Sequence, residues 1–201
     1  MTPLGLLDGI RVLDLGTEVS GPFCSKLLAD YGADVIKVEL PGSGDPSRRM
    51  GPFAGDDPNP EKSIPFLYIN TNKRGVTLDT RSSSGRELLE ALLQTADVLV
   101  ENVPPAQAGE LGLDYAGLTR NNPGLVVTSI TAFGQSGPYR DYSATDLVNC
   151  AFSGLMYHTG DSDREPLHNA LNQSLYVAGA NAAVATSAAL FHRMATGRGQ
   201  H

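Results

Sequence analysis

The 201-residue sequence has no tryptophan, only two cysteines, and 15 lysines and arginines against 22 aspartates and glutamates. The formal charge of -7 disfavours a nucleic-acid or anionic-membrane surface, because both require clustered basic side chains. A small anionic ligand stays compatible with this balance. No apolar run approaches the roughly 20 residues that span a bilayer, and residues 1–9 lack the blocks of a signal peptide. We therefore expect a soluble, cytoplasmic protein without nucleic-acid or membrane partners.

Metal and redox motifs are missing as well. Cys24 and Cys150 lie far apart within segments of helical pattern, and no CxxC or Cys/His spacing suits zinc. We expect two inert buried thiols and no metal site. The histidines follow no ligand pattern; they are His158, His168, His192 and His201.

Nucleotide-binding fingerprints are also absent. The sequence contains no GxxxxGK[ST] motif of a phosphate-binding loop and no GxSxG motif of a hydrolase. A dinucleotide site would require GxGxxG between the first strand and its helix, where residues 15–23 read LGTEVSGPF. A dinucleotide oxidoreductase is thus an alternative that depends only on the order of strands and helices.

Segments typical of strands alternate with segments of helical periodicity. Strands are predicted at 10–15, 34–39, 75–79, 97–101 and 125–130, and helices at 21–30, 83–96, 146–156 and 172–193. This alternation predicts one α/β unit, a Rossmann-like fold with a mostly parallel sheet and helices on both faces. Ligands bind such sheets beyond the carboxyl ends of the strands. The segments expected there are 17–20, 39–45, 102–105 and 131–140.

Two segments near this edge could bind an anion. The GSGD sequence at 42–45 begins a loop rich in glycine and proline that runs to residue 65, and glycines can expose backbone N–H groups to a phosphate. An ordinary turn explains GSGD equally well. The NTNKRG sequence at 70–75 places two cations beside a strand, where they could meet phosphate oxygens or form a solvated turn.

Six segments resemble, in order, successive signatures of the class III CoA-transferases, a group that includes formyl-CoA transferase, carnitine CoA-transferase and methylacyl-CoA racemase. They are GIRVLDLGTEVSGPF, YGADVIKVELPGSGDPSRR, NTNKRGVTLD, ADVLVEN, SITAFGQSGPYRD and ALFHRMATGRGQ. The resemblance covers nearly the whole chain. It implies a large CoA-binding domain whose two terminal segments meet around a small domain, in a dimer of interlocked subunits.

Relative to that family, residues 1–201 resemble the N-terminal portion of the large domain, without the small domain and the C-terminal return segment. The resemblance therefore implies a fold that is incomplete in this chain, as in a fragment, a truncated gene product or one module of a fusion. The implied partners are an acyl-CoA and a carboxylic acid, together with a second copy or a complementary C-terminal module. CoA is implied as a substrate, with no metal.

The resemblance also implies a set of CoA contacts along the strand ends. Among them, Lys73, Arg74 and Arg81 are the expected phosphate partners. The full set is Val19, Ser20, Leu40, Lys73, Arg74, Leu78, Asp79, Thr80, Arg81, Asn102, Val103, Pro104, Ser143 and Asp146.

Three positions depart from the family pattern. The transferase aspartate, which attacks the thioester, is expected just before a YVAG-like run, and Leu175 holds that position. Glu110 replaces an arginine that commonly contacts CoA, and Thr145 replaces the histidine of the racemase branch. The nearest carboxylates in the upstream loop, which reach the site only with a shift of register, are Asp161, Asp163 and Glu165.

These features lead to one expected function and two alternatives. The leading expectation is CoA transfer between an acyl-CoA and a carboxylic acid, in which this chain lacks its own nucleophile and depends on another segment or subunit. The first alternative is a non-catalytic half that binds CoA or forms the dimer. The second, an acyl-CoA racemase or isomerase, is disfavoured by Thr145.

Overall fold

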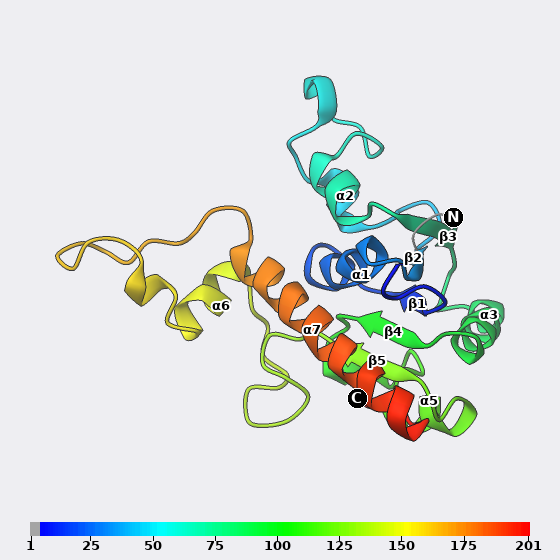
Figure 1. The fold of residues 1–201 in the computed structure, drawn as a ribbon. Coiled ribbons are helices and arrows are strands. Elements are labelled where there is room, and N and C mark those ends of the chain that lie inside the picture. The colour runs from blue at the N-terminus through cyan, green and yellow to red at the C-terminus, as the bar shows by residue number, and fades with distance from the viewer. Residues whose placement is uncertain (1–4) are drawn as a thin grey trace.

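The computed structural model describes residues 5–201 and contains a five-stranded sheet (Figure 1). Its strands are β1 (Arg11–Asp14), β2 (Asp34–Glu39), β3 (Lys73–Thr77), β4 (Val98–Glu101) and β5 (Val126–Ser129). The strand order is β3-β2-β1-β4-β5, and every neighbouring pair is parallel. The predicted α/β fold with a parallel sheet is confirmed. The direction of winding reverses between β1 and β4, which is where ligands bind doubly wound sheets.

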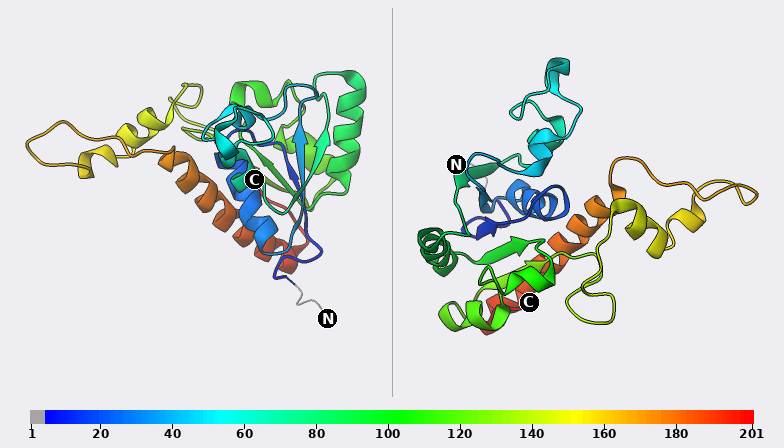
Figure 2. Two further views of the ribbon diagram at one scale, coloured as in Figure 1. Left: turned by 90° about the horizontal axis from the view of Figure 1, so that it is seen from above. Right: turned by 180° about the vertical axis from the view of Figure 1, so that it is seen from behind.

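The described residues contain seven α-helices: α1 (Ser20–Asp30), α2 (Ile64–Ile69), α3 (Ser83–Gln94), α4 (Pro105–Ala108), α5 (Tyr115–Asn121), α6 (Asp146–Phe152) and α7 (Gln173–Thr196). Helices α1 and α7 cover one face, where Leu28 and Leu190 pack on Val98. Helices α3 and α5 cover the other face, where Leu89 and Leu118 belong to the cluster around the central strands (Figure 2). Helices on both faces are confirmed.

The element boundaries follow the strength of the local pattern. Strand β2 has the predicted limits. Three of its four central residues are apolar, and all four are buried, as is usual for a parallel strand between two layers of helices. Strand β3 begins at Lys73, two residues before the predicted start, and α6 ends at Phe152, four residues before the predicted end. Helices α2, α4 and α5 span seven residues or fewer and were not predicted, since so short a segment shows little periodicity.

Helix α7 is long and apolar, with a mean hydropathy of 1.3 over its most apolar 18-residue window. By length and composition it could cross a membrane, so the expectation of no such run was wrong on this point. A core helix of a soluble protein passes the same test. In the fold α7 lies along α1 and β5 and buries Gly179, Ala183, Thr186 and Leu190, but only 22% of the apolar window is buried among the described residues.

Residues 131–172, which we call the arm, connect β5 to α7 and project away from the sheet (Figures 1 and 2). The arm carries α6 and a short 3-10 turn at Met156–His158. One attachment joins it to the start of α7, where the backbone N–H of Ser174 donates to the carboxylate of Asp146 at 2.9 Å. The arm therefore approaches the sheet mainly at its two ends.

Gly179 allows α7 to approach α1 closely. A Cβ atom at this position would lie 2.6 Å from the carbonyl oxygen of Ser20 and 3.2 Å from the backbone nitrogen of Cys24. Because both neighbours are helix backbone, the substitution Gly179→Ala must push the two helices apart. We expect it to lower the free energy of unfolding by about 1–3 kcal/mol.

Thermal and denaturant unfolding of the full-length protein measure this effect. The matched control is Gly109→Ala, where a Cβ meets nothing within 4 Å and φ is -64°. The control should stay within about 0.5 kcal/mol of the parent protein. Equal stability of the two variants would mean that the α1–α7 contact tolerates a methyl group.

Candidate functional site

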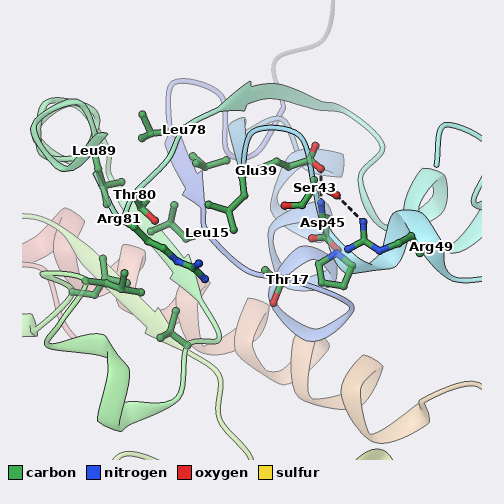
Figure 3. A pocket seen from close by; sticks show the side chains of 17 residues that line it. Leu15, Thr17, Glu39, Ser43, Asp45, Arg49, Leu78, Thr80, Arg81 and Leu89 are labelled. Carbon is green, nitrogen blue, oxygen red and sulfur yellow. Dashed lines mark hydrogen bonds between the residues drawn. The ribbon is translucent and has the colours of Figure 1, made fainter. Parts of the chain in front are cut away.

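A cavity of about 280 Å³ opens at the carboxyl ends of β1 and β2, between the GSGD loop and the turn after β3 (Figure 3). Its floor is apolar and includes Leu15, Leu78 and Leu89. Arg49 and Arg81 lie on opposite sides of the opening. We call this space the GSGD cavity. Its shape, an apolar floor with two guanidinium groups at the rim, suits a ligand that has both an apolar and an anionic part.

The GSGD loop is fixed by its own hydrogen bonds. The N–H of Gly44 donates to the carbonyl of Leu40 at 3.0 Å, and the N–H of Asp45 donates to Oε2 of Glu39 at 2.8 Å. Gly44 has φ of 62°, and a Cβ there would crowd Arg48 and Glu39. Since these two N–H groups are already used within the protein, the geometry favours a tight turn over a loop that cradles phosphate.

Glu39 is itself held by Arg48. The guanidinium donates to both carboxylate oxygens, at 2.7 and 2.8 Å. These hydrogen bonds, together with that from Asp45, lower the pKa of Glu39 against the opposing effect of burial. Glu39 is therefore an ionised anchor for the loop and not a proton donor at neutral pH.

A buried charge network lies beneath the cavity. Nζ of Lys37 contacts Oδ2 of Asp45 at 2.7 Å and the carbonyl of Gly16, and both charged side chains are at most 3% exposed. The other carboxylate oxygen of Asp45 accepts from the N–H of Ser47 at 2.8 Å and that of Glu18 at 3.1 Å. The network therefore joins β2, the β1–α1 turn and the GSGD loop.

Lys73 extends the same network and does not reach the cavity. Its ammonium group contacts Asp14 at 3.0 Å, the carbonyl of Pro22 at 2.7 Å and Oδ1 of Asn70 at 2.8 Å. Three acceptors use all three donors of the ammonium, so none remains for a phosphate. Burial opposes ionisation of Asp14, but the charges of Lys37 and Lys73 outweigh it and lower the pKa of Asp14.

Arg74 is also placed away from the cavity. Its guanidinium donates to both oxygens of Asp34, at 2.9 and 2.7 Å, near the amino end of β2. Arg81 alone of the three expected phosphate partners lies at the cavity. The predicted phosphate role of Lys73 and Arg74 thus finds no support in their positions, and NTNKRG forms structural ion pairs.

A second cavity, of about 330 Å³, contains Leu175 in its wall; we call it the Leu175 cavity. Asn102 lies beside it at the end of β4 and holds the β1–α1 turn by two hydrogen bonds to the backbone of Thr17, both at 2.8 Å. The two hydrogen bonds hold the β1–α1 turn beside the end of β4, at the switch point of the sheet. The side chain of Leu175 offers the cavity no oxygen or nitrogen, so a ligand there meets an alkyl group at the position where the sequence comparison leads us to expect a carboxylate.

The expected CoA contacts divide between the two cavities. Leu40, Leu78, Thr80, Arg81 and Val103 line the GSGD cavity. Ser20, Asn102, Pro104 and Ser143 line the Leu175 cavity. The remaining members of the set line neither; they are Val19, Lys73, Arg74, Asp79 and Asp146. The fold thus brings nine expected contacts to the carboxyl edge of the sheet.

Asp146 forms a polar cluster at the base of the arm. Its Oδ2 lies 2.6 Å from Nε2 of His168, and Oδ1 accepts from Ser174. Burial opposes ionisation, but the hydrogen bonds from Ser174 and His168 outweigh it and lower the pKa of Asp146. Cys150, Asp146 and His168 each offer a ligand atom within 4.8 Å of the others, a grouping that sequence spacing did not predict. Both carboxylate oxygens of Asp146 already have hydrogen-bond partners. The cluster therefore attaches the arm to the start of α7.

The structure places the other residues that the sequence analysis singled out against the family pattern. Glu110 is exposed in the turn after α4, next to Leu111 of the GSGD cavity. Thr145 is the N-cap of α6, and its hydroxyl accepts the N–H of Val148 at 3.5 Å. The loop carboxylates Asp161, Asp163 and Glu165 are exposed on the arm and line neither cavity.

Two cavity arginines were missed by the sequence analysis. Arg49 follows GSGD in the sequence GSGDPSRR and donates to the carbonyl of Ser43 at 2.7 Å. Arg140, in the sequence GPYRD, lines the Leu175 cavity. Both arginines immediately follow or lie within segments expected at the carboxyl edge, and this position was the available signal.

An open, doubly wound parallel sheet with cavities at its switch point defines the class of α/β proteins that bind nucleotides and coenzymes. Within this class the sequence profile of CoA-transferase family III matches residues 7–201. The chain belongs to CoA-transferase family III.

Curated relatives and solved structures agree with this assignment. The chain is 43% identical over 190 residues to succinyl-CoA:(R)-benzylsuccinate CoA-transferase subunit BbsE of Thauera aromatica, with 94% of this chain and 46% of the relative covered. It is 40% identical over 197 residues to the succinate--glutarate CoA-transferase of Agrobacterium fabrum, with 97% and 49% covered. A CAIB/BAIF family protein from Brucella suis has a similar structure, with a TM-score of 0.90, 37% identity, and 98% and 52% covered. The chain spans about half the length of the relatives it matches.

The buried pair under the GSGD cavity gives a stability prediction. In Lys37→Met the carboxylate of Asp45 stays buried without its cation, and we expect a loss of about 3–5 kcal/mol in the free energy of unfolding. The control is Lys62→Met, because the pair of Lys62 with Asp57 is 45% and 55% exposed. The control should lose at most about 1 kcal/mol. Denaturant titration of both full-length variants compares them, and similar losses would contradict a central role for Lys37.

Proposed function

We propose that this chain is the CoA-binding half of a family III CoA-transferase and that it supplies no nucleophile of its own. The observation that carries the proposal is Leu175, which faces the Leu175 cavity at the position of the expected aspartate. Transfer through an enzyme-bound thioester requires a carboxylate that attacks the acyl-CoA, forms a mixed anhydride and releases the CoA thiolate. A leucine side chain has no lone pair for the first of these steps.

The two cavities support a path for CoA along the strand ends. In this proposal the phosphate groups lie at the GSGD cavity, between Arg49 and Arg81, and the thioester end lies toward Asn102 and Leu175. Guanidinium groups suit phosphate oxygens because their donors are fixed in a plane and stay charged at all physiological pH values. Glu110 is exposed next to Leu111 of the GSGD cavity, and its negative charge would oppose this field.

A catalytic carboxylate from another subunit or segment would complete the transferase. The relative from Thauera aromatica is named as one subunit of its enzyme, which is consistent with activity that depends on more than one chain. A homodimer or a complementary C-terminal module is proposed as the partner. A cytoplasmic location and the absence of nucleic-acid partners stay predictions from composition.

The first test concerns the phosphate partners. Arg81→Gln and Arg49→Gln should each weaken CoA binding about tenfold or more, because each removes a charge-assisted hydrogen bond. Calorimetry of the full-length protein with CoA measures the change. Arg120→Gln, on the exposed side of α5, is the control and should bind CoA like the parent protein. Unchanged binding in both cavity variants would place the phosphates elsewhere.

The second test concerns the nucleophile. In the full-length protein, purified without any other family III subunit, Leu175→Asp should allow exchange of a labelled carboxylic acid into its CoA ester, and the parent protein should show none. Leu175→Asn has nearly the same shape as Leu175→Asp but no nucleophilic carboxylate, so it should also show none. Exchange by the parent protein at the rate of the aspartate variant would mean that another residue of this protein is the nucleophile.

A further inference from the structure

Four aromatic side chains of the arm form a continuous cluster. Phe152 lies 5.3 Å from Phe133 and 5.6 Å from Tyr139, measured between ring centroids, and Tyr139 lies 5.4 Å from Tyr142. The rings of these three pairs meet at angles of 67–76°, the edge-to-face arrangement that aromatic groups prefer. The arm thus presents a surface built from ring faces and edges, which we call the aromatic cluster.

The aromatic cluster borders the Leu175 cavity. Tyr142 is part of the wall of that cavity. Phe133 and Phe152 line an adjoining cavity of about 680 Å³, which shares Thr131, Ala132, Asn149 and Ala178 with the first. The cavity that contains Leu175 and the cavity that contains the rings therefore adjoin each other. Each is large enough to hold a small ligand, since such sites commonly measure about 300–1,000 Å³.

The described residues 5–201 cover the apolar surfaces of the rings only in part. Tyr139 is 45% exposed, Tyr142 62% and Phe152 63%, although the three pack on one another. Contiguous exposed apolar surfaces mark interaction sites, and ligand-binding grooves are among them. The ring edges and faces of the aromatic cluster are available to a further aromatic group.

Two polar atoms in the same cavity wall lack hydrogen-bond partners. Nε of Arg140 and Oγ1 of Thr131 are buried, and no described residue forms a hydrogen bond with either. Asp141 lies 3.3 Å from Nε of Arg140, but at an angle that does not satisfy a hydrogen bond. Buried polar atoms without partners are rare in native structures. Arg140 also lines the cavity with a side chain that is 40% exposed, so its positive charge can attract a carboxylate there.

We propose that the Leu175 cavity and the aromatic cluster bind a carboxylic acid that carries an aromatic group. Arg140 holds the carboxylate, and the rings of Tyr139, Tyr142 and Phe152 surround the aromatic group. The inference extends the proposed function, since it identifies the chemical class of the acid that exchanges CoA. It requires no covalent step at Leu175.

The preference for an aromatic acid follows from the geometry of the rings. An aliphatic acid of equal size buries a similar apolar area, but it cannot make edge-to-face contacts. Such contacts add to area burial, so the aromatic acid should bind about three- to tenfold more tightly. The carboxylate contributes equally to both acids through Arg140.

The experiment compares 3-phenylpropionate with 3-cyclohexylpropionate, which differ only in the ring. Both acids are titrated into the full-length protein by calorimetry, and CoA is titrated separately. We expect the aromatic acid to bind about three- to tenfold more tightly. Tyr142→Leu and Phe152→Leu should abolish this difference, and Arg140→Gln should weaken both acids about tenfold. The substituted side chains are well exposed, at 62% and 63% for the two rings, so folding should be preserved.

The controls come from the same arm. Tyr157→Leu replaces a tyrosine that is 85% exposed and lies beside His158, and Arg164→Gln replaces an arginine that is 77% exposed. Both should leave the affinities and the aromatic preference unchanged. Equal affinity for the two acids, or a preference that survives both ring substitutions, would overturn the inference. A change in oligomeric state without a change in acid affinity would overturn it too, because the cluster would then be an interface.

The separate CoA titration distinguishes this inference from the proposed function. If CoA binds and no aromatic preference is found, the inference is wrong and the proposed CoA-binding half stands. If CoA does not bind, the proposed function fails, and a measured aromatic preference still assigns the cavity to an aryl acid.

Discussion

The contact between Lys37 and Asp45 is the interaction on which the candidate site depends. It lies at the carboxyl end of β2, and the same two residues reach the β1–α1 turn through Gly16 and Glu18. Ion pairs buried this deeply are seldom strong stabilisers, because desolvation offsets their attraction. Their geometry is nevertheless restrictive, since each charge must keep its partners. The pair therefore fixes where the GSGD loop lies relative to the sheet, and the mouth of the GSGD cavity follows from that position.

The candidate site combines a polar framework with an apolar side chain in one cavity wall. The turn held by Asn102 and the arginines that line the two cavities lie at the carboxyl edge of the sheet. Leu175 presents an alkyl group to the cavity beside Asn102. Membership of CoA-transferase family III accounts for the framework, and the proposal that this chain supplies no nucleophile depends on residue 175.

The sequence predicted the framework better than the site, for physical reasons. Strand β2 is apolar enough, and bounded clearly enough by Gly32 and the GSGD loop, for its limits to be read directly. The positions of charged groups were harder to predict. Lys73 and Arg74 are adjacent in a strand, so their side chains point to opposite faces of the sheet. Lys73 is buried because it contacts Asp14, which lies about 60 positions away in the sequence. His168 and Asp146 meet only because the arm returns to α7, a path that no local pattern indicates.

The choice of cation at the two cavities has a chemical consequence. Thioesters acylate free amines, but an arginine guanidinium stays protonated and is a poor nucleophile. Among the described residues, no lysine lines either the GSGD cavity or the Leu175 cavity, whereas Arg49, Arg81 and Arg140 do. Lys37 and Lys73 lie close by but are at most 3% exposed and held by carboxylates. An activated acyl group bound at this edge would therefore meet positive charge without an accessible amine, and the protein would be protected from acylating itself.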